Sequence, residues 1–315
     1  MKITVLDGFA VNPGDLDWGI IGQYGDLTVY DRTASDEESI QRIGSSEIVM
    51  VNKTPLSESV LAACPDLKLV CVLATGYNVV DYVAARKLGI DVCNVPCYGT
   101  AAVAQFTIAL LLELCHHVGR HDVLVHNGAW TSCQDFCLWT TPQMELAGKT
   151  LGIIGYGRIG QSVAAIARAL GMEVIAYNRS PKDGVRNVDL ETLLTASDVI
   201  SLHCPLFPET QNIISRENIA KMKDGVLLLN TSRGALLDEQ AVADALASGR
   251  IRGAAMDVVT VEPIRKDNPL LTAPNCLITP HMAWAPLESR KRLLQTVADN
   301  VRCFLEGKPQ NVVNP

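Results

Sequence analysis

Hydrophobic and polar positions along the chain form segments of two lengths. The short apolar runs, such as ITVLDG (3–8), LKLVCVLATG (67–76) and VLLLNTS (226–232), have the length of strands and lack a regular polar face. The longer segments, such as RIGQSVAAIARALG (158–171), carry apolar residues at helical spacing and end in glycine. This alternation predicts an α/β protein whose parallel sheets are covered by helices on both faces.

The strand–helix alternation occurs twice. A long apolar helix is expected over residues 101–119, between the two series, where it is a candidate crossover or dimer-forming helix. The second series ends with CLITPH (276–281), and the amphipathic helix that follows has no strand left to pair with there. We therefore predict two doubly wound domains, one of residues 1–99 plus 286–315 and one of residues 100–285. An active site is expected between them, at the carboxyl ends of the strands.

Composition excludes several classes of function. The net charge of −7 and the lack of a Lys/Arg-rich run argue against nucleic-acid binding. The longest apolar run, interrupted by Gln105 and Glu113, falls short of the ~20 residues of a membrane span, and the N-terminus lacks a signal-peptide pattern. Ten cysteines without a CxxC pair predict reduced thiols and no metal site. A cytoplasmic protein without nucleic-acid or membrane partners is expected.

The segment GYGRIG connects a predicted strand to a predicted helix. In this context Gly155 allows a tight turn, Gly157 lets the backbone approach a pyrophosphate, and Gly160 lets helix and strand pack closely. The N–H groups at the start of the helix favour phosphate binding. The sequence thus predicts a dinucleotide cofactor.

The residues after the next strand bear on which dinucleotide is bound. Where NAD-binding chains usually have an acidic residue, this chain has Asn178, followed by Arg179 and Ser180. Loss of the acid removes repulsion of a 2′-phosphate, and an adjacent Arg and Ser can bind that phosphate. The pattern favours NADP. The alternative is NAD, with Asn178 bound to the ribose and Arg179 in a solvated turn.

Three polar residues follow strands of the second series. Arg233, Glu262 and His281 stand at or just beyond strand ends, which face one crevice in a parallel sheet. A His can transfer the proton that accompanies a hydride, a Glu can orient it and favour its protonated form, and an Arg can polarise a carbonyl and pair with a carboxylate. Their shared placement predicts a catalytic set.

These motifs together resemble the D-isomer-specific 2-hydroxyacid dehydrogenases. The resemblance covers essentially the whole chain and rests on GYGRIG, HCPL (203–206), LLLNTSRGALLDE (227–239), MDVVTVEP (256–263) and ITPHMAW (278–284). It implies a Rossmann-like dinucleotide-binding domain, a discontinuous flavodoxin-like substrate domain, and catalysis by Arg233, Glu262 and His281. It also implies that the substrate carboxylate is received by Ala74, Thr75, Gly76, Tyr77 and Arg233, and that the cofactor is lined by Thr75, Arg158, Ile159, Cys204, Thr231, Ser232 and Asp257. Asp257 is expected to face the nicotinamide carboxamide.

Within that family, the chain is most similar to the glycerate dehydrogenases, also called hydroxypyruvate reductases. LDGFAVNPGDL (6–16) and VNKTPLS (51–57) carry this finer resemblance, which implies hydroxypyruvate or glyoxylate as substrate and a homodimer. A D-lactate or aromatic D-2-hydroxyacid dehydrogenase is the alternative among enzymes. A dinucleotide-sensing corepressor is the alternative among binding proteins. The aromatic-rich stretch WTSCQDFCLW (130–139) is expected either to be buried in an interface or to reach a neighbour's substrate cleft.

Overall fold

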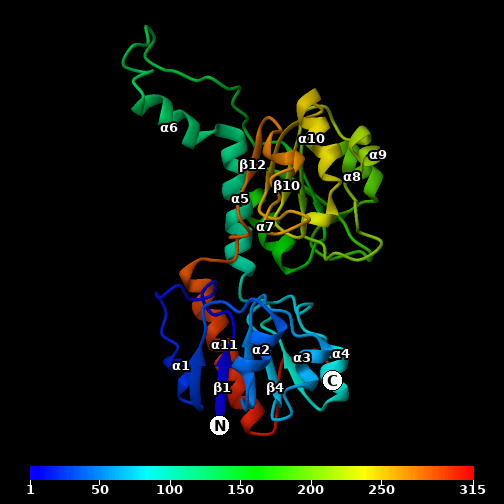
Figure 1. The fold of residues 1–315 in the computed structure, drawn as a ribbon. Coiled ribbons are helices and arrows are strands. Elements are labelled where there is room, and N and C mark those ends of the chain that lie inside the picture. Colours follow the sequence, from blue (N-terminus) through cyan, green and yellow to red (C-terminus); the bar gives the residue numbers. More distant parts are fainter. The chain divides into compact units, whose positions relative to one another are not determined.

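The computed structural model describes residues 1–315, which form two compact units (Figure 1). Unit 1 consists of Met1–Gly99 and Ala285–Pro315, and unit 2 consists of Thr100–Trp284. Each unit contains one sheet in which every pair of neighbouring strands is parallel. The predicted α/β fold with two doubly wound sheets is therefore confirmed.

Unit 1 has a five-stranded sheet in the order β2-β1-β3-β4-β5. Its elements in chain order are β1 (Lys2–Val5), α1 (Gly19–Gly22), β2 (Asp26–Val29), α2 (Asp36–Ile43), β3 (Ile48–Val51), α3 (Glu58–Ala62), β4 (Leu69–Val72), α4 (Tyr82–Lys87), β5 (Asp91–Cys93) and α11 (Leu287–Leu305). Strand order reverses at β1, because β2 lies on one side of it and β3 on the other. The position between β1 and β3 is the topological switch point of this sheet.

The central strands of unit 1 are buried on both faces, as their unbroken apolar sequences predict. Val49 and Val51 of β3 pack in the cluster that includes residues of α2, α3 and α4. The C-terminal helix α11 contacts β4 and α1, and its inward residues include Leu293 and Val297, one turn apart. Residues 285–315 thus complete the core of the domain that begins at residue 1.

Unit 2 has a seven-stranded sheet in the order β12-β11-β10-β9-β6-β7-β8, with its switch point between β6 and β9. Its elements are α5 (Thr100–His116), α6 (Val118–His126), β6 (Thr150–Ile154), α7 (Arg158–Ala169), β7 (Glu173–Tyr177), β8 (Arg186–Asn187), α8 (Leu190–Ala196), β9 (Val199–Leu202), α9 (Arg216–Lys221), β10 (Val226–Asn230), the 3₁₀ helix η1 (Gly234–Leu236), α10 (Glu239–Ser248), β11 (Ile251–Met256), the 3₁₀ helix η2 (Pro269–Leu271) and β12 (Cys276–Ile278). The two-residue strand β8 was not predicted, since its exposed Arg and Asn give no apolar signal.

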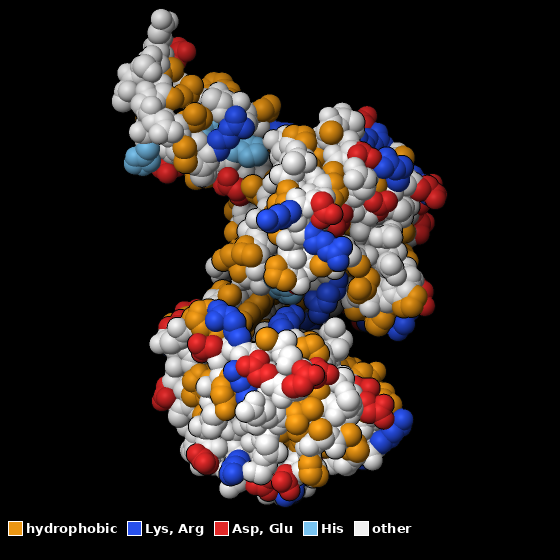
Figure 2. All heavy atoms as spheres, in the orientation of Figure 1, with side chains coloured by type: hydrophobic (Ala, Val, Ile, Leu, Met, Phe, Trp, Pro, Cys, Tyr) orange, Lys and Arg blue, Asp and Glu red, His pale blue; other side chains and the backbone are white.

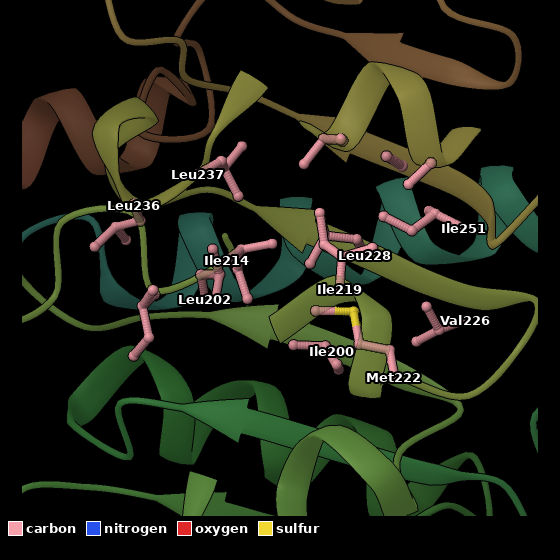
Figure 3. Close-up of a cluster of buried hydrophobic side chains, with 14 of the residues drawn as sticks. Ile200, Leu202, Ile214, Ile219, Met222, Val226, Leu228, Leu236, Leu237 and Ile251 are labelled. Carbon is pink, nitrogen blue, oxygen red and sulfur yellow. The ribbon is translucent and has the colours of Figure 1, made fainter. Parts of the chain in front are cut away.

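The two faces of this sheet have separate cores. Because side chains alternate along a strand, Val226 and Leu228 of β10 belong to one core, shown in Figure 3, and Leu227 and Leu229 belong to the other. The first core includes residues of α8, α9 and α10, and the second includes residues of α5 and α7. The sheet is held rigidly from both sides, so its strand ends are fixed supports for the loops that follow.

The predicted helix over residues 101–119 is broken. His117 has φ of +47°, and it separates the largely buried α5 from α6, which has no buried residue. α6 and the segment after it project from the rest of unit 2 as an arm of residues 118–141 (Figure 1), and the chain rejoins the core at Pro142 and Met144. No single helix is long and apolar enough to cross a membrane; only α5 and α6 taken together, bent by 55°, have the necessary length and composition.

Candidate functional site

The turn between β6 and α7 depends on two glycines at close contacts. Gly155 has φ of +99°, and a Cβ added to it would lie 2.4 Å from the backbone nitrogen of Cys204, at the end of the neighbouring β9. A Cβ on Gly160 would lie 2.5 Å from the carbonyl oxygen of Gly155. The turn can therefore pack against β9 and α7 only with glycine at both positions.

The third glycine of the turn faces open space. No atom lies within 4 Å of the place where a Cβ of Gly157 would stand, and no side chain caps the N-terminus of α7. Arg158 and Ile159 are the first residues of this 12-residue helix. The N–H groups at a helix N-terminus suit a pyrophosphate, and the absence of a side chain at Gly157 lets it approach them, so this turn fits a dinucleotide.

Asn178 follows β7 beside this turn. Its Oδ1 accepts a hydrogen bond of 2.6 Å from the backbone N–H of Tyr156, which fixes the orientation of the amide. The opposite end of the amide, Nδ2, is buried and has no partner. Arg179 and Ser180, which come next, are exposed. An unpartnered buried donor next to a phosphate-binding turn is suited to an acceptor oxygen of a bound cofactor.

The loops after β9 and β10 are tied to each other. The Ser232 hydroxyl donates to the carbonyl oxygen of Cys204 at 2.7 Å, and the hydroxyls of Thr231 and Thr107 are 2.8 Å apart. Burial raises the pKa of the Cys204 thiol to about 11. This thiol stays protonated near neutral pH and is suited to lining a site rather than to acting as a nucleophile.

Asp257, just beyond β11, is 1% exposed, and its carboxylate accepts three hydrogen bonds. The donors are the Thr279 hydroxyl at 2.6 Å and the backbone N–H groups of Met282 and Ala283, both at 2.9 Å. Both carboxylate oxygens are thus engaged by the turn that carries His281.

The structure brings Glu262 and His281 together. Nδ1 of His281 lies 2.6 Å from Oε2 of Glu262, and the two side chains are 30% and 34% exposed. The other carboxylate oxygen accepts a hydrogen bond of 3.3 Å from the backbone N–H of Val259. Because Nδ1 is engaged by the carboxylate, Nε2 is the ring nitrogen available to exchange a proton with another molecule.

Arg233 lies on a turn that packs against the Glu262 loop. A Cβ on Gly234 would lie 1.9 Å from the backbone carbon of Val259, so only glycine permits this approach. The buried Asn230 holds the turn, since its Nδ2 donates to the carbonyl oxygen of Arg233 at 2.8 Å. The Arg233 guanidinium itself donates to the Ser232 carbonyl oxygen at 2.7 Å.

The predicted substrate loop belongs to unit 1 and follows β4. The Thr75 hydroxyl donates to the carbonyl oxygen of Val95 at 2.8 Å, and Nδ2 of Asn94 donates to the carbonyl oxygen of Thr75 at 2.7 Å. Gly76 and Tyr77 come next, with the Tyr77 ring edge-to-face against Tyr82. These contacts attach the loop of residues 74–77 to the segment after β5 and to α4.

Two residues of this region were missed from the sequence. Asn230 was detectable in principle, because it interrupts the apolar run VLLLNTS, and a polar residue at the end of a buried strand requires partners. Trp284, whose Nε1 donates to the carbonyl oxygen of His281 at 2.9 Å, gave no such signal. An aromatic residue in a loop is as easily explained by packing.

The known proteins that are similar to this chain are dehydrogenases and reductases. Residues 108–283 match the family described as D-isomer specific 2-hydroxyacid dehydrogenase, NAD binding domain. A hydroxypyruvate reductase of Blautia hydrogenotrophica is 57% identical over 100% of both chains, and a glycerate dehydrogenase of Methylorubrum extorquens is 46% identical over 99% of this chain and 98% of that protein. The solved structure of an acyclic imino acid reductase in complex with NADPH and D-Arg aligns over 99% of this chain and 100% of its own, with 34% identity and a TM-score of 0.86.

Proposed function

Because the chain belongs to the D-isomer specific 2-hydroxyacid dehydrogenase family, we propose that it reduces hydroxypyruvate or glyoxylate to the corresponding 2-hydroxy acid. The names of the two relatives that span the whole chain support hydroxypyruvate, and a glyoxylate reductase of Korarchaeum cryptofilum, 37% identical over 92% of this chain, supports glyoxylate. The observation that carries the proposal is the 2.6 Å contact between Glu262 and His281, which is the geometry of an oriented acid–base histidine.

The three proposed catalytic residues have separate tasks. Nε2 of His281 gives the carbonyl oxygen its proton, and Glu262 holds Nδ1 and so orients the ring. Arg233 pairs with the substrate carboxylate and polarises the carbonyl, and the backbone of residues 74–77 receives the same carboxylate. When bound, the nicotinamide supplies the hydride to C2 of the keto acid. In this division unit 2 supplies the dinucleotide-binding turn and the three catalytic residues, and unit 1 supplies the loop of residues 74–77.

NADP is the proposed cofactor, with NAD as the alternative. The amide of Asn178 is oriented by Tyr156 so that its donor end is unpartnered, whereas an Asp in its place would present acceptors. A donor at this position favours a 2′-phosphate oxygen, and the exposed Arg179 and Ser180 can bind the remaining phosphate oxygens. A charged hydrogen bond contributes roughly 1.5–3 kcal/mol, which corresponds to about ten- to a hundredfold discrimination.

A homodimer is proposed from the arm of residues 118–141. Val118, Val123, Phe136 and Trp139 are 57–90% exposed, and Figure 2 shows hydrophobic side chains gathered over α6. Exposed apolar patches of this kind mark interaction surfaces, and a second copy of the chain is the proposed occupant. We also propose a cytoplasmic location, where the ten free cysteines would stay reduced.

The test of the proposed function is an assay of hydroxypyruvate, glyoxylate, pyruvate and phenylpyruvate with NADPH and with NADH. We expect kcat/KM to be highest for the first two acids and higher with NADPH than with NADH. Negligible turnover of all four acids would instead favour a dinucleotide-sensing binding protein, and a preference for pyruvate or phenylpyruvate would favour the enzyme alternatives.

The cofactor proposal is tested by three variants in the same assay. Arg179→Ala should lower the NADPH/NADH ratio of kcat/KM about tenfold, and Asn178→Asp should move the preference toward NADH. Arg302→Ala, which removes an exposed arginine from α11 in unit 1, is the control for loss of charge and should leave the ratio unchanged. An unmodified enzyme that uses NADH as well as NADPH would contradict the preference and leave the proposed chemistry standing.

A further inference from the structure

His281 has an unusual backbone conformation. Its φ is +53°, in the left-handed region that residues other than glycine seldom adopt. A side chain in this conformation leaves the backbone in a different direction from one in the extended or helical regions. The position of the imidazole, and its 2.6 Å contact with Glu262, therefore depend on whatever keeps the backbone there.

Both backbone polar groups of His281 are bound within unit 2. Its N–H donates to the carbonyl oxygens of Asp257 at 2.8 Å and Thr279 at 3.0 Å. Its carbonyl oxygen accepts the hydrogen bond of 2.9 Å from Nε1 of Trp284. The indole is half-buried, and Trp284 follows His281 by three residues, so this bond closes the turn on the side away from β12.

The Asp257 carboxylate also holds this turn in place. Its three bonds, to the Thr279 hydroxyl and to the N–H groups of Met282 and Ala283, involve residues on both sides of His281. With the carboxylate holding the flanks and the indole holding the centre, the carbonyl of His281 has little freedom to rotate. Because the N–H of His281 is also held, a rotation about the N–Cα bond that returned φ to negative values would displace the ring and carry the carbonyl oxygen away from the indole N–H.

We infer that Trp284 is a positioning residue, which through its indole N–H holds His281 in the left-handed conformation that sets Nδ1 against Glu262. This inference rests on the proposed role of His281 as proton donor. It extends that role to a residue that would itself touch neither substrate nor cofactor. Misplacement of a reacting group by about 1 Å can cost about a hundredfold in rate, so the loss of a single hydrogen bond at this position can lower kcat.

The test is Trp284→Phe, which keeps an aromatic ring and removes the N–H donor. We expect kcat for keto-acid reduction to fall about tenfold, while the Kd for NADPH changes less than twofold. The control is Trp18→Phe, because Trp18 is a partly buried tryptophan of unit 1 with no side-chain hydrogen bond. It should leave kcat unchanged.

The pH profile separates positioning from a general loss of structure. The charged groups on the segments around His281 are Glu262, the Asp257 carboxylate and Arg233 on the adjoining turn. In Trp284→Phe only the pairing with Glu262 should loosen, so the pH profile of keto-acid reduction should change in the same way as in Glu262→Gln. A fall in the amount of folded enzyme would reduce kcat at every pH and leave the profile in place.

Each outcome decides the inference. Unchanged kcat and pH profile in Trp284→Phe would overturn it, as would a lower kcat with an unmoved profile. If Trp284→Phe does not fold, Thr279→Val, which removes one bond to Asp257, should show a smaller shift in the same direction, and an unmoved profile there would overturn the inference. Normal turnover by His281→Ala would instead refute the proposed function, so the two failures are distinguishable.

Discussion

Both units have a switch point in their sheet, but the loops there differ in whether a side chain of the protein itself occupies the anion-binding position. In unit 1, the chain leaves β1 and reaches Asp7, whose carboxylate accepts hydrogen bonds from three successive backbone N–H groups after β3. They belong to Asn52 (2.7 Å), Lys53 (2.5 Å) and Thr54 (2.7 Å). Successive N–H groups of this kind form an anion-binding concavity. In unit 1 that concavity is filled by a carboxylate of the chain itself.

In unit 2 the equivalent place is left open. The chain leaves β6 through Gly155, which packs against Cys204 after β9, and the space in front of Gly157 is empty of protein atoms. Close by, Nδ2 of Asn178 lacks a partner. The same topology therefore yields a loop closed by its own carboxylate in one unit and an open glycine turn in the other. The two loops differ in sequence: unit 1 has an acidic side chain in LDG, and unit 2 has the glycines of GYGRIG.

The largest effect should come from removing the proposed acid–base group, which lies in unit 2. His281→Ala should lower kcat for keto-acid reduction by about 10²–10⁴-fold. The Kd for NADPH should change little, because the phosphate-binding turn is a separate part of the unit. Steady-state kinetics with fluorescence titration of NADPH measures both quantities. Near-normal turnover would show that the proton comes from another group.

Next in size is the effect of closing the open turn. Gly155→Ala adds a methyl group where backbone lies 2.4 Å away, at a φ of +99°. Overpacking and backbone strain together should cost about 2–6 kcal/mol in the free energy of unfolding, and NADPH affinity should fall as the turn moves. Gly148→Ala is the matched control: φ is +75° but no atom is within 4 Å, so only the strain remains. Equal losses in the two variants would show that close approach at Gly155 is unimportant.

The sequence predicted the open site better than the closed one. The Gly155–Gly160 turn and the unusual Asn178 are local signals, because each glycine or polar residue is required by its own strand end. The contact of Asp7 with residues 52–54 is not local. The acid and the three amides are some 45 residues apart, and no residue in VNKTP indicates that its backbone N–H lacks a partner. The break at His117 was missed because no glycine or proline stands at or before it in residues 101–117 to mark the end of the helix.

Emptying the closed site should have a smaller effect with a distinctive signature. Asp7→Ala should reduce the free energy of unfolding by about 2–4 kcal/mol, since three hydrogen bonds to a charged acceptor are lost. A cavity of about 400 Å³, lined by Asp7, Arg32 and Lys53 among others, borders the position, so a small anion can enter it. Inorganic phosphate should then raise the Tm of Asp7→Ala more than that of the unmodified enzyme.

Two conditions make this test specific. Saturating NADPH is present throughout, so that the turn in unit 2 is occupied and does not contribute. Asp7→Asn, which keeps the bulk of the side chain, should lose stability without gaining a response to phosphate. If phosphate affects all three proteins equally, the N–H groups after β3 do not form an anion site, and the parallel between the units fails.

The smallest expected effect concerns His203, which follows β9 immediately before the Cys204 backbone that contacts Gly155. Burial lowers its pKa from 6.5 to about 4, and Nε2 is 2.8 Å from the hydroxyl of the buried Ser201. In the unfolded chain this ring gains a proton below pH 6.5, whereas in the folded protein it stays neutral until about pH 4. The unfolded state thus binds more protons in this window, so stability falls as pH falls from 6.5 to 4, by about 1–3 kcal/mol.

His203→Gln keeps a hydrogen-bonding side chain that does not titrate and should flatten this part of the stability curve. His126→Gln, which alters a histidine 79% exposed on α6, should not. Urea unfolding at a series of pH values checks both. Curves of the same slope for His203→Gln and the unmodified protein would mean that the ring is protonated without unfolding, and that the loop facing the open turn is looser than the closed loop of unit 1.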